Sequence, residues 1–415
     1  MRRILWRDVQ AIACNPVNSR YRTRMNSFDF TQTPDRSYTG SLKWQKYAGQ
    51  DILPMWVADM DFLSAPDVRD ALRSRVDHGV FGYTVPYQEA QQAVIDYLQR
   101  EHQTPVEKDM ICWLPGLVQG LNLVCRAAGE AGDAVLVNTP VYPPFLSAPI
   151  FSDRKRITSE LVQMDDGRFT FDREGMEAAV TPETKLFILC NPHNPVGRVF
   201  DREELLWLLD FCEKHDLWIC SDEIHCDLIL DEDAPHVPFL SLGERAARRS
   251  IVFMSPSKTY NLPGLACAYA VIPNPEIRRA FQKVCRGIIT EVNCFGYTGL
   301  IAAYSKGEPW RQELLGVLKE NLRRIEQTLS EKLPRVQMPN IEATYLAWLD
   351  FRAYSLESPV HFFEQNGIGL SNGVDFGAPK GFLRLNFGCS TERLQEGLDL
   401  ICTALDRRGS DLQGS

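Results

Sequence analysis

Short apolar runs alternate with longer amphipathic segments between about residue 66 and residue 300. The runs that predict strands are AVLVN (134–138), KLFILC (185–190), LWICSDE (217–223), IVFMS (251–255) and AYAVIP (268–273). Between the second and third runs lies DREELLWLLDFCEKHD, whose leucines recur at helical spacing after an acidic first turn. This alternation is typical of a parallel sheet flanked by helices, so it predicts an α/β core.

The pattern changes after about residue 300. WRQELLGVLKENLRRIEQTLSEKL predicts one long amphipathic helix, IEATYLAWLDF and GFLRLNF predict strands, and TERLQEGLDLICTALDRR predicts a closing helix. We therefore expect a smaller α+β domain over residues 301–415, joined by an N-terminal segment over residues 27–65, beside a large domain over residues 66–300. Residues 1–26 contain positive charge but no apolar signal region, and we expect them to be a disordered extension.

Composition and charge narrow the range of partners. The 415 residues are 44% hydrophobic, which is ample for a sizeable core. A formal net charge of −9, without a basic run, gives no electrostatic footprint for nucleic acid or an anionic membrane. No apolar run approaches the roughly 18 residues that a membrane span needs. Small molecules and other proteins are therefore the expected partners.

The twelve cysteines are expected to be reduced core thiols. They show no C-x-x-C spacing, and most lie within apolar segments, as Cys190, Cys212, Cys220 and Cys267 do. This placement argues against a disulfide or zinc framework and favours a cytoplasmic protein.

Polar motifs follow the predicted strands. NTPVYPPF follows the first strand, NPHNPVGR follows the second, SDEIHCD closes the third and SPSK follows the fourth. Ligands of open α/β sheets bind outside the carboxyl ends of the strands, so these loops should converge on one site.

Two parts of this region could hold an anion. WLPGLVQG places a Pro-Gly loop before a helix, so backbone N–H groups near Val118 and Gln119 could cradle a phosphate, although a loop that simply enters a core helix has the same appearance. Ser255 and Ser257 could donate to a phosphate, but serines beside prolines are also ordinary turn residues.

Three titratable residues stand in apolar surroundings. Asp222 ends an apolar strand, where a carboxylate needs an ion pair, a helix cap or a cationic ligand such as a protonated heterocycle. His225, three residues on, is a candidate site residue or a satisfied core histidine. Lys258 lies between two strands. Withdrawal from water would lower its pKa and free its amine as nucleophile and base, whereas a solvated loop lysine would stay charged.

Taken together, NPHNPVG, SDEIHCDLIL, SPSKTYNLPGL and RLNFG resemble the pyridoxal-phosphate enzymes of aminotransferase class I/II, fold type I. The order and spacing of these motifs agree over nearly the whole chain beyond residue 27. The resemblance implies a mostly parallel seven-stranded sheet between helices in a large domain, with a smaller α+β domain. It also implies pyridoxal 5′-phosphate as cofactor and a homodimer with active sites at the interface.

The same resemblance implies a role for each candidate residue. Lys258 would bond covalently to the cofactor, Asp222 would pair with its protonated pyridine nitrogen, and Arg384 would clamp the substrate α-carboxylate. Asp59 lies in a segment that could line the substrate tail or belong to the core. The other implied cofactor-binding residues are Val118, Gln119, Tyr142, Asn194, His225, Ser255 and Ser257, with Tyr83 reaching across the dimer interface.

Further short motifs of the sequence resemble one branch of this superfamily. LPMWVADMDF, FGYT and TPVYPPF, with His225 where a tyrosine is common, resemble the carbon–sulfur β-lyases that act on cystathionine and cysteine S-conjugates. Ala266 stands where many aminotransferases have a phosphate-binding arginine, which favours the lyase branch. After LNFGC the chain continues STERL, where lyases often have a Pro-Arg step, so the wall near Arg384 departs from that pattern.

The resemblance therefore implies α,β-elimination from L-cystathionine or a related L-cysteine S-conjugate, giving a thiol, pyruvate and ammonia. Amino transfer to a 2-oxo acid is the first alternative, and a non-catalytic regulatory protein on the same fold is the second. Lys258, Asp222, Asn194 and Arg384 together argue against the second alternative, because a bare scaffold needs none of these buried polar groups.

Overall fold

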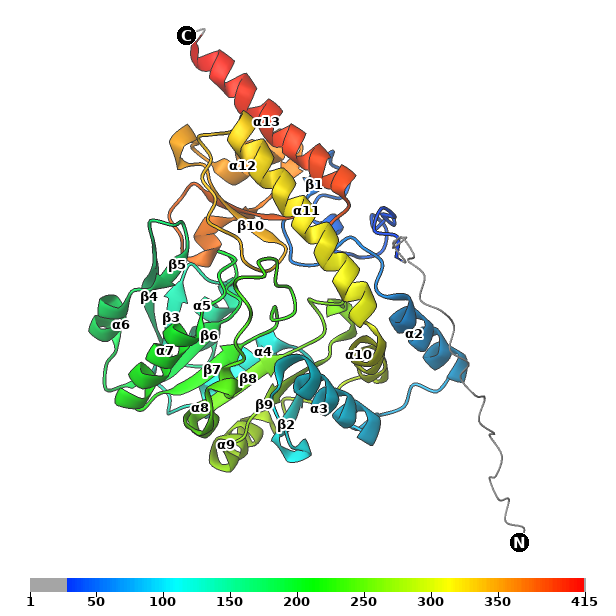
Figure 1. The fold of residues 1–415 in the computed structure, drawn as a ribbon, viewed down its shortest axis with the longest axis vertical. Coiled ribbons are helices and arrows are strands. Elements are labelled where there is room, and N and C mark those ends of the chain that lie inside the picture. Colours follow the sequence, from blue (N-terminus) through cyan, green and yellow to red (C-terminus); the bar gives the residue numbers. More distant parts are fainter. Residues whose placement is uncertain (1–27, 414–415) are drawn as a thin grey trace, which may run out of the picture.

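The computed structural model describes residues 28–413, so the extension expected over residues 1–26 lies outside the described residues. Its large part is built on one sheet in the order β2-β9-β8-β7-β6-β3-β4-β5 (Figure 1). The strands are β2 (Ile111–Leu114), β3 (Ala134–Thr139), β4 (Lys155–Gln163), β5 (Phe169–Phe171), β6 (Thr184–Cys190), β7 (Trp218–Asp222), β8 (Ser250–Met254) and β9 (Ala268–Val271).

The five strands predicted from the apolar runs are confirmed as β3, β6, β7, β8 and β9, with ends that differ by one or two residues. Neighbours β4, β3, β6, β7 and β8 pair in parallel, whereas β2, β5 and β9 pair antiparallel. The mostly parallel sheet is thus confirmed. The expected count of seven strands is wrong, since this sheet has eight: the three-residue β5 pairs with the end of β4 at the sheet edge.

Helices cover both faces of this sheet because its strands are apolar on both sides. Val135 and Val137 of β3 belong to the core under α4 (Leu117–Ala127), α5 (Pro143–Phe151) and α9 (Pro275–Cys285), whereas Leu136 belongs to the core on the opposite face. The other helices of the large part are α2 (Pro66–His78), α3 (Gln88–His102), α6 (Arg173–Ala179), α7 (Arg202–Lys214), α8 (Glu244–Arg249) and α10 (Cys294–Lys306).

The helix predicted between the second and third runs is α7. Asp201 caps it by accepting the backbone N–H groups of Glu203 and Glu204, and the Glu204 carboxylate accepts the N–H of Asp201 in return. This reciprocal capping satisfies N–H groups that a helix start otherwise leaves without partners. It fixes the connection from β6 to β7, whose carboxyl ends meet at the site described below.

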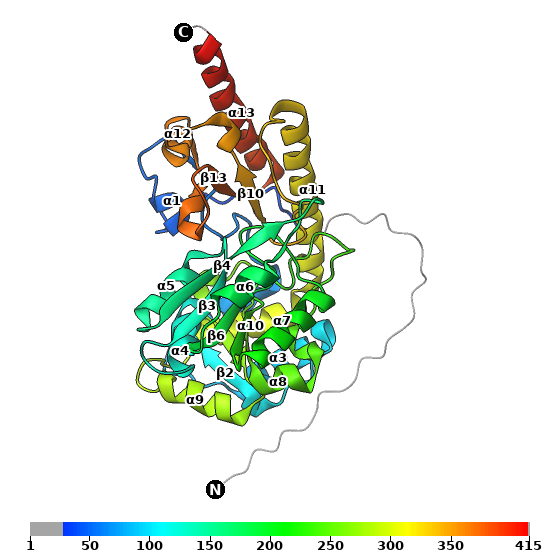
Figure 2. The ribbon, with the colours of Figure 1, turned by 90° about the vertical axis from the view of Figure 1, so that its left-hand side faces the viewer.

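The smaller part follows the long helix α11 (Glu308–Lys332) and lies over one end of the sheet (Figure 2). The predicted strands are confirmed as β10 (Leu346–Asp350) and β13 (Phe382–Asn386), and the closing helix as α13 (Thr391–Gln413). The N-terminal segment reaches this part, because β1 pairs with β11. Its remaining elements are α1 (Leu42–Gln45), β1 (Leu53–Pro54), α12 (Pro359–Gln365), β11 (Ile368–Gly369) and β12 (Ser371–Asn372).

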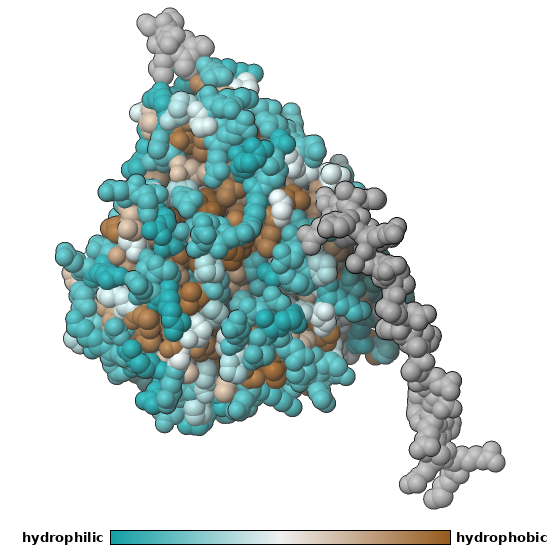
Figure 3. Space-filling view, viewed as in Figure 1, coloured by the Kyte–Doolittle hydropathy of each residue, from teal (hydrophilic) through white to brown (hydrophobic). Residues whose placement is uncertain are grey.

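Hydrophilic residues cover most of the outer helices in the view of Figure 3, and apolar residues show mainly between them. Between residues 28 and 413, no helix is both long and apolar enough to cross a membrane. The described cysteines are all unpaired and, except for Cys285, buried. Their placement within apolar segments therefore agrees with the expectation of core thiols.

Candidate active site

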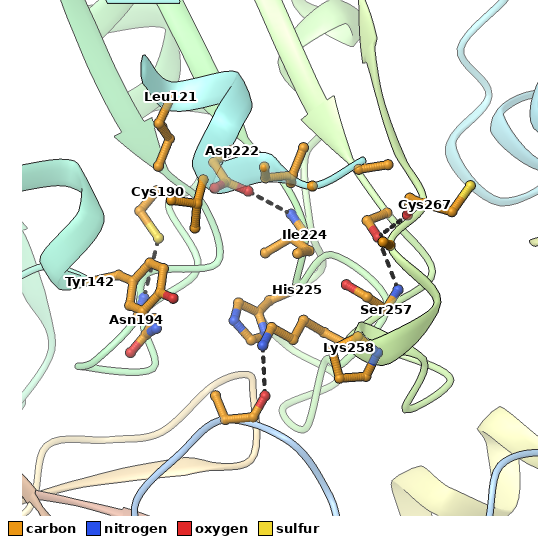
Figure 4. A pocket seen from close by; sticks show the side chains of 18 of the residues that line it. Leu121, Tyr142, Cys190, Asn194, Asp222, Ile224, His225, Ser257, Lys258 and Cys267 are labelled. Carbon is orange, nitrogen blue, oxygen red and sulfur yellow. Dashed lines mark hydrogen bonds between the residues drawn. The ribbon is translucent and has the colours of Figure 1, made fainter. Parts of the chain in front are cut away.

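A pocket opens at the carboxyl ends of β6, β7 and β8, beside the first turn of α4 (Figure 4). The sequence-predicted residues that line it come from five separate loops or strand ends: Val118, Tyr142, Asn194, Asp222, His225, Ser255, Ser257 and Lys258. Ala58 and Ala266 line the same pocket. The convergence expected from the positions of the polar motifs is thus present in the structure.

Asp222, the last residue of β7, lies buried at the floor of this pocket. The backbone N–H of Ile224 donates to its carboxylate at 3.2 Å, and no cation of the described chain lies within ion-pairing distance of it. Burial raises the pKa of Asp222 to about 7. A protonated nitrogen placed here would supply the missing positive partner.

Lys258 follows β8 and points its amine into the pocket (Figure 4). Its Nζ donates to the backbone carbonyl of Ala58 at 2.6 Å. Burial and then the nearby charge of Arg384 lower the pKa of Lys258 to about 8, against the opposing effects of Asp59 and Asp222. About a tenth of this amine is therefore uncharged at pH 7, far more than for an ordinary lysine, and is available as a nucleophile or base.

His225 and Asn194 flank the amine and the carboxylate (Figure 4). His225 is buried, and its Nδ1 has no hydrogen-bond partner. Burial, followed by the charges of Lys258 and Arg384, holds the pKa of His225 well below its usual range, so its imidazole is neutral. Asn194 accepts a hydrogen bond from Arg384 Nη1 at 2.9 Å through its side-chain oxygen.

Arg384, on β13 of the smaller part, is a buried guanidinium with no carboxylate partner in the described chain. Its Nη2 donates to the Trp56 carbonyl at 2.9 Å and to Ser371 Oγ at 3.3 Å, and its Nε has no partner. Burial lowers the pKa of Arg384 to about 10. Such a group is prepared to bind an anion in its two-pronged geometry.

The predicted phosphate end lies at the start of α4, where Gly116 precedes the helix and Val118 lines the pocket. A Cβ on Gly116 would lie 2.7 Å from Oε1 of Gln119, the end of a flexible and exposed side chain that can move aside. Ser255 Oγ donates to the Cys267 carbonyl at 2.8 Å and accepts the N–H of Ser257 at 3.1 Å. The N–H groups at the start of α4 and the Ser257 hydroxyl together suit an anion, whereas the Ser255 hydroxyl would first have to turn away from the Cys267 carbonyl.

Four predicted residues lie outside the pocket lining, and one of them, Arg384, contacts it through its hydrogen bond to Asn194. Gln119 is exposed, and its side chain lies over Gly116 rather than in the pocket. Tyr83 is fully exposed in a loop between α2 and α3. Asp59 is bound to Arg36 at 2.6 Å, while its Oδ1 is buried without a partner.

The sequence did not indicate residues that act on the site through a backbone oxygen or through another side chain. The Tyr345 hydroxyl donates to the Ala58 carbonyl at 3.0 Å, and Ser371 contacts Arg384. Tyr345 stands in ATYLAWLDF, where the strand pattern conceals it as one more buried aromatic residue. Ala58 contributes an oxygen that every residue type has, so no residue pattern could have indicated it.

Comparisons with known proteins agree with this geometry. A profile described as aminotransferase class I and II matches residues 50–401. The chain belongs to this family. Cystathionine beta-lyase PatB of Bacillus subtilis (strain 168) is 40% identical over 387 residues, covering 91% of this chain and all of that protein.

Two solved structures extend the comparison. The crystal structure of OvoB has a TM-score of 0.88 and 41% identity, covering 91% of this chain and 99% of that chain. Cystalysin from Treponema denticola, whose crystal structure contains pyridoxal 5′-phosphate, has a TM-score of 0.88 and 33% identity, covering 92% and 99%. Within the family, the chain belongs to the carbon–sulfur lyase branch and has the type I fold.

The residues present fit pyridoxal 5′-phosphate, which is the cofactor of this enzyme. Asp222 lacks a cation that a protonated ring nitrogen would supply, and His225 Nδ1 lacks a partner. The start of α4 with the neighbouring serines offers donors for the phosphate, and Lys258 offers an amine for the aldehyde. Asp222, Lys258 and the start of α4 thus each have a counterpart on the cofactor.

Proposed function

We propose that this enzyme cleaves L-cystathionine or a related L-cysteine S-conjugate by α,β-elimination. With one water, the thioether gives a thiol, pyruvate and ammonia. The observation that carries the proposal is the 40% identity, over the full length of that protein, to a cystathionine beta-lyase. The pocket supports it, because an amine and a buried carboxyl line it, and the Arg384 guanidinium binds the side chain of Asn194 in its wall.

When bound, pyridoxal 5′-phosphate supplies an electrophilic aldehyde for the substrate amine and an electron sink for the bond broken at Cα. Arg384 binds the substrate α-carboxylate and so orients the Cα–H bond. The amine of Lys258 takes the Cα proton, for which its lowered pKa of about 8 is suited. Asp222 holds a proton on the ring nitrogen, since both groups lose their burial cost when paired.

The remaining lining residues act on the cofactor itself in this proposal. Tyr142 would stack on the ring, Asn194 and His225 would contact its phenolic oxygen, and Val118, Ser255 and Ser257 would hold the phosphate; all of them line one pocket. Gln119 would contribute only its backbone N–H, because its side chain lies elsewhere.

One residue of the pocket wall favours elimination over amino transfer. Ala266 lines the pocket at the position where many aminotransferases have an arginine, and it adopts a φ of 52°. The site lacks that extra cation toward the phosphate.

The deciding experiment is to incubate the cofactor-loaded enzyme with L-cystathionine and no 2-oxo acid, and to measure pyruvate and free thiol. Both products should form in equal amounts. Amino transfer to an added 2-oxo acid, with neither pyruvate nor thiol released, would overturn the proposal. A panel of S-alkyl-L-cysteines then ranks the thioethers.

We also propose a homodimer. The loop between α2 and α3 exposes Val80, Phe81, Tyr83 and Val85, an apolar set that a monomer seldom leaves in water. Tyr83 from one subunit would then reach the cofactor of the other. Sedimentation of the purified enzyme tests the dimer, and activity regained on mixing Tyr83→Ala with Lys258→Ala subunits tests the shared site.

The proposal includes the domain division and the location. Residues 66–300 would form the cofactor-binding domain, and residues 301–415 with 27–65 the smaller one, which the pairing of β1 with β11 supports. We propose a cytoplasmic location, because buried unpaired thiols are typical of reducing compartments.

A further inference from the structure

The amine of Lys258 is held by a backbone oxygen rather than by an acid. Its Nζ lies 2.6 Å from the carbonyl oxygen of Ala58, and the same oxygen accepts the Tyr345 hydroxyl at 3.0 Å. Tyr345 is 1% exposed, and its ring meets that of His225 nearly edge-on, with centroids 6.1 Å apart. A carbonyl oxygen has two lone pairs, so it can accept both donors at once.

Asn386 clamps the peptide groups on both sides of Ala58. Its Nδ2 donates to the carbonyl of Val57 at 2.5 Å and to that of Asp59 at 2.7 Å, while its Oδ1 accepts the N–H of Gly388 at 2.8 Å. Asn386 is 1% exposed, so these bonds form away from water. The Ala58 carbonyl therefore has its direction set by its neighbours as well as by its own donors.

The residue directly before Tyr345 has a strained backbone. Thr344, directly before it, is completely buried and adopts a φ of 77°, a region that β-branched residues rarely enter. Its N–H donates to the Leu228 carbonyl at 2.8 Å, which helps to hold this conformation. Strained residues of this kind concentrate at functional sites, because surrounding structure must maintain them.

We propose that Tyr345 and Asn386 are positioning residues that fix the Ala58 carbonyl as the seat of the free amine of Lys258. The inference rests on the proposed function, in which this amine takes the Cα proton. An amine that paired with Asp222 instead would be held as an ammonium and would neutralise the carboxylate that the cofactor nitrogen needs. The seat keeps the two groups apart.

Replacement of Tyr345 by Phe should release this restraint. The charged groups that face Lys258 are Arg384, Asp59 and Asp222, and His225 beside it is neutral. With only the Asn386 clamp remaining, the carbonyl holds the amine less firmly and the amine can approach either carboxylate, so the ammonium form gains stability and the pKa of Lys258 rises.

Competitive acetylation tests this directly in the full-length chain without cofactor. The rate at which Lys258 reacts is followed against pH by mass spectrometry of its peptide, and Lys258→Ala identifies the signal. The midpoint for Tyr345→Phe should rise by about 0.5–1 pH unit, the size expected from one altered hydrogen bond to a charged group. A midpoint equal to that of the unaltered chain would overturn the proposal.

Tyr269→Phe is the matched control. Tyr269 is equally buried, and its hydroxyl lies 3.1 Å from that of Tyr304, outside the pocket lining. The Tyr269→Phe substitution removes one buried hydroxyl that does not contact the Ala58 carbonyl, so the pH midpoint of Lys258 acetylation should stay unchanged. An equal rise in this control would show that loss of packing alone moves Lys258, and would also overturn the proposal.

Steady-state kinetics on the cofactor-loaded enzyme provide a second readout. Tyr345→Phe should lower kcat for cystathionine cleavage by about 10–100-fold, with KM changed by less than about twofold, because substrate binding does not use the seat. Asn386→Ala should act in the same direction; if it does not fold, the acetylation result for Tyr345→Phe decides alone. If no thioether yields pyruvate with the unaltered enzyme, the proposed function fails, while acetylation still tests the seat.

Discussion

Asp222 and Asp227 belong to one short motif, SDEIHCD, yet they end in opposite electrostatic situations. Asp222 faces the pocket with one backbone donor, and burial raises its pKa to about 7. Asp227 lies on the other side of the motif, where Tyr97 donates to it at 2.7 Å and Thr259 at 3.1 Å. Burial would raise the pKa of Asp227, but His102 and Arg311 hold it well below its usual range.

Glu223 and His225 repeat the contrast. Glu223 accepts hydrogen bonds from Ser221 Oγ and from the Phe239 N–H, both at 2.9 Å, and lies 3.1 Å from His236. His225 Nδ1, by comparison, has no partner. Interleaved residues of one motif thus serve two regions: a polar cluster whose carboxylates each accept several hydrogen bonds, and a pocket whose carboxylate accepts a single backbone N–H.

The largest effect is expected at Lys258, where substitution should abolish activity and leave the stability of the fold nearly unchanged. Lys258→Ala should lower pyruvate release by at least about 10³-fold, because it removes both the amine that joins the cofactor and the base. Its thermal unfolding midpoint without cofactor should remain close to that of the unaltered chain, because only one hydrogen bond to a carbonyl is lost. Retained activity would show that Lys258 is not the catalytic amine.

Asp227→Asn and Asp222→Asn form a matched pair that tests the contrast itself. Asp227→Asn should cost about 3–5 kcal/mol of unfolding free energy, because it leaves buried partners of a charged group unmatched. Asp222→Asn should cost little or should stabilise the cofactor-free chain, while lowering activity strongly. Denaturant unfolding and pyruvate release, measured on both variants, would contradict the contrast if the two stability changes were equal.

The pH dependence of stability should carry the signature of Asp222. Its pKa is raised from 3.8 to about 7 on folding, so between these values the folded chain binds more protons than the unfolded chain. Its contribution is present below pH 4 and is lost as pH rises to about 7, up to about 4 kcal/mol at 1.36 kcal/mol per pKa unit. Relative to Asp222→Asn, the cofactor-free chain should therefore weaken over this range. Equal pH profiles would refute the raised pKa.

The smallest effect is expected inside the polar cluster around Glu223 and Asp227. Glu223→Gln keeps the shape and one acceptor but removes the charge that faces His236. It should cost about 1–3 kcal/mol of unfolding free energy and leave KM for cystathionine unchanged. A larger change in KM than in stability would place Glu223 with the pocket instead.

Much of this arrangement could be predicted from the sequence. The buried strands β3, β6, β7, β8 and β9 are apolar throughout, so their positions were visible. By contrast, β4 alternates exposed and buried residues near the sheet edge, and the three-residue β5 is shorter than any pattern can indicate. Strands whose burial is partial leave a weak signal.

The site shows the same division. Asp222 and Lys258 were visible because a charge within an apolar stretch needs an explanation, and Arg384 was indicated by the family resemblance of RLNFG. Tyr345 and Asn386 were not, because they act on backbone carbonyls that any residue supplies. Whether Gln119 turned inward or outward depends on the contact its side chain makes with Gly116, which spacing does not determine.

The carbonyl oxygens of residues 56–59 give the enzyme a tolerance that a side-chain device would lack. The bonds to Val57 and Ala58 engage only main-chain oxygens of this segment, so they do not depend on which side chains it has. Evolution or a designer can therefore alter this wall of the pocket to suit a different leaving group while the proton-transfer apparatus stays intact.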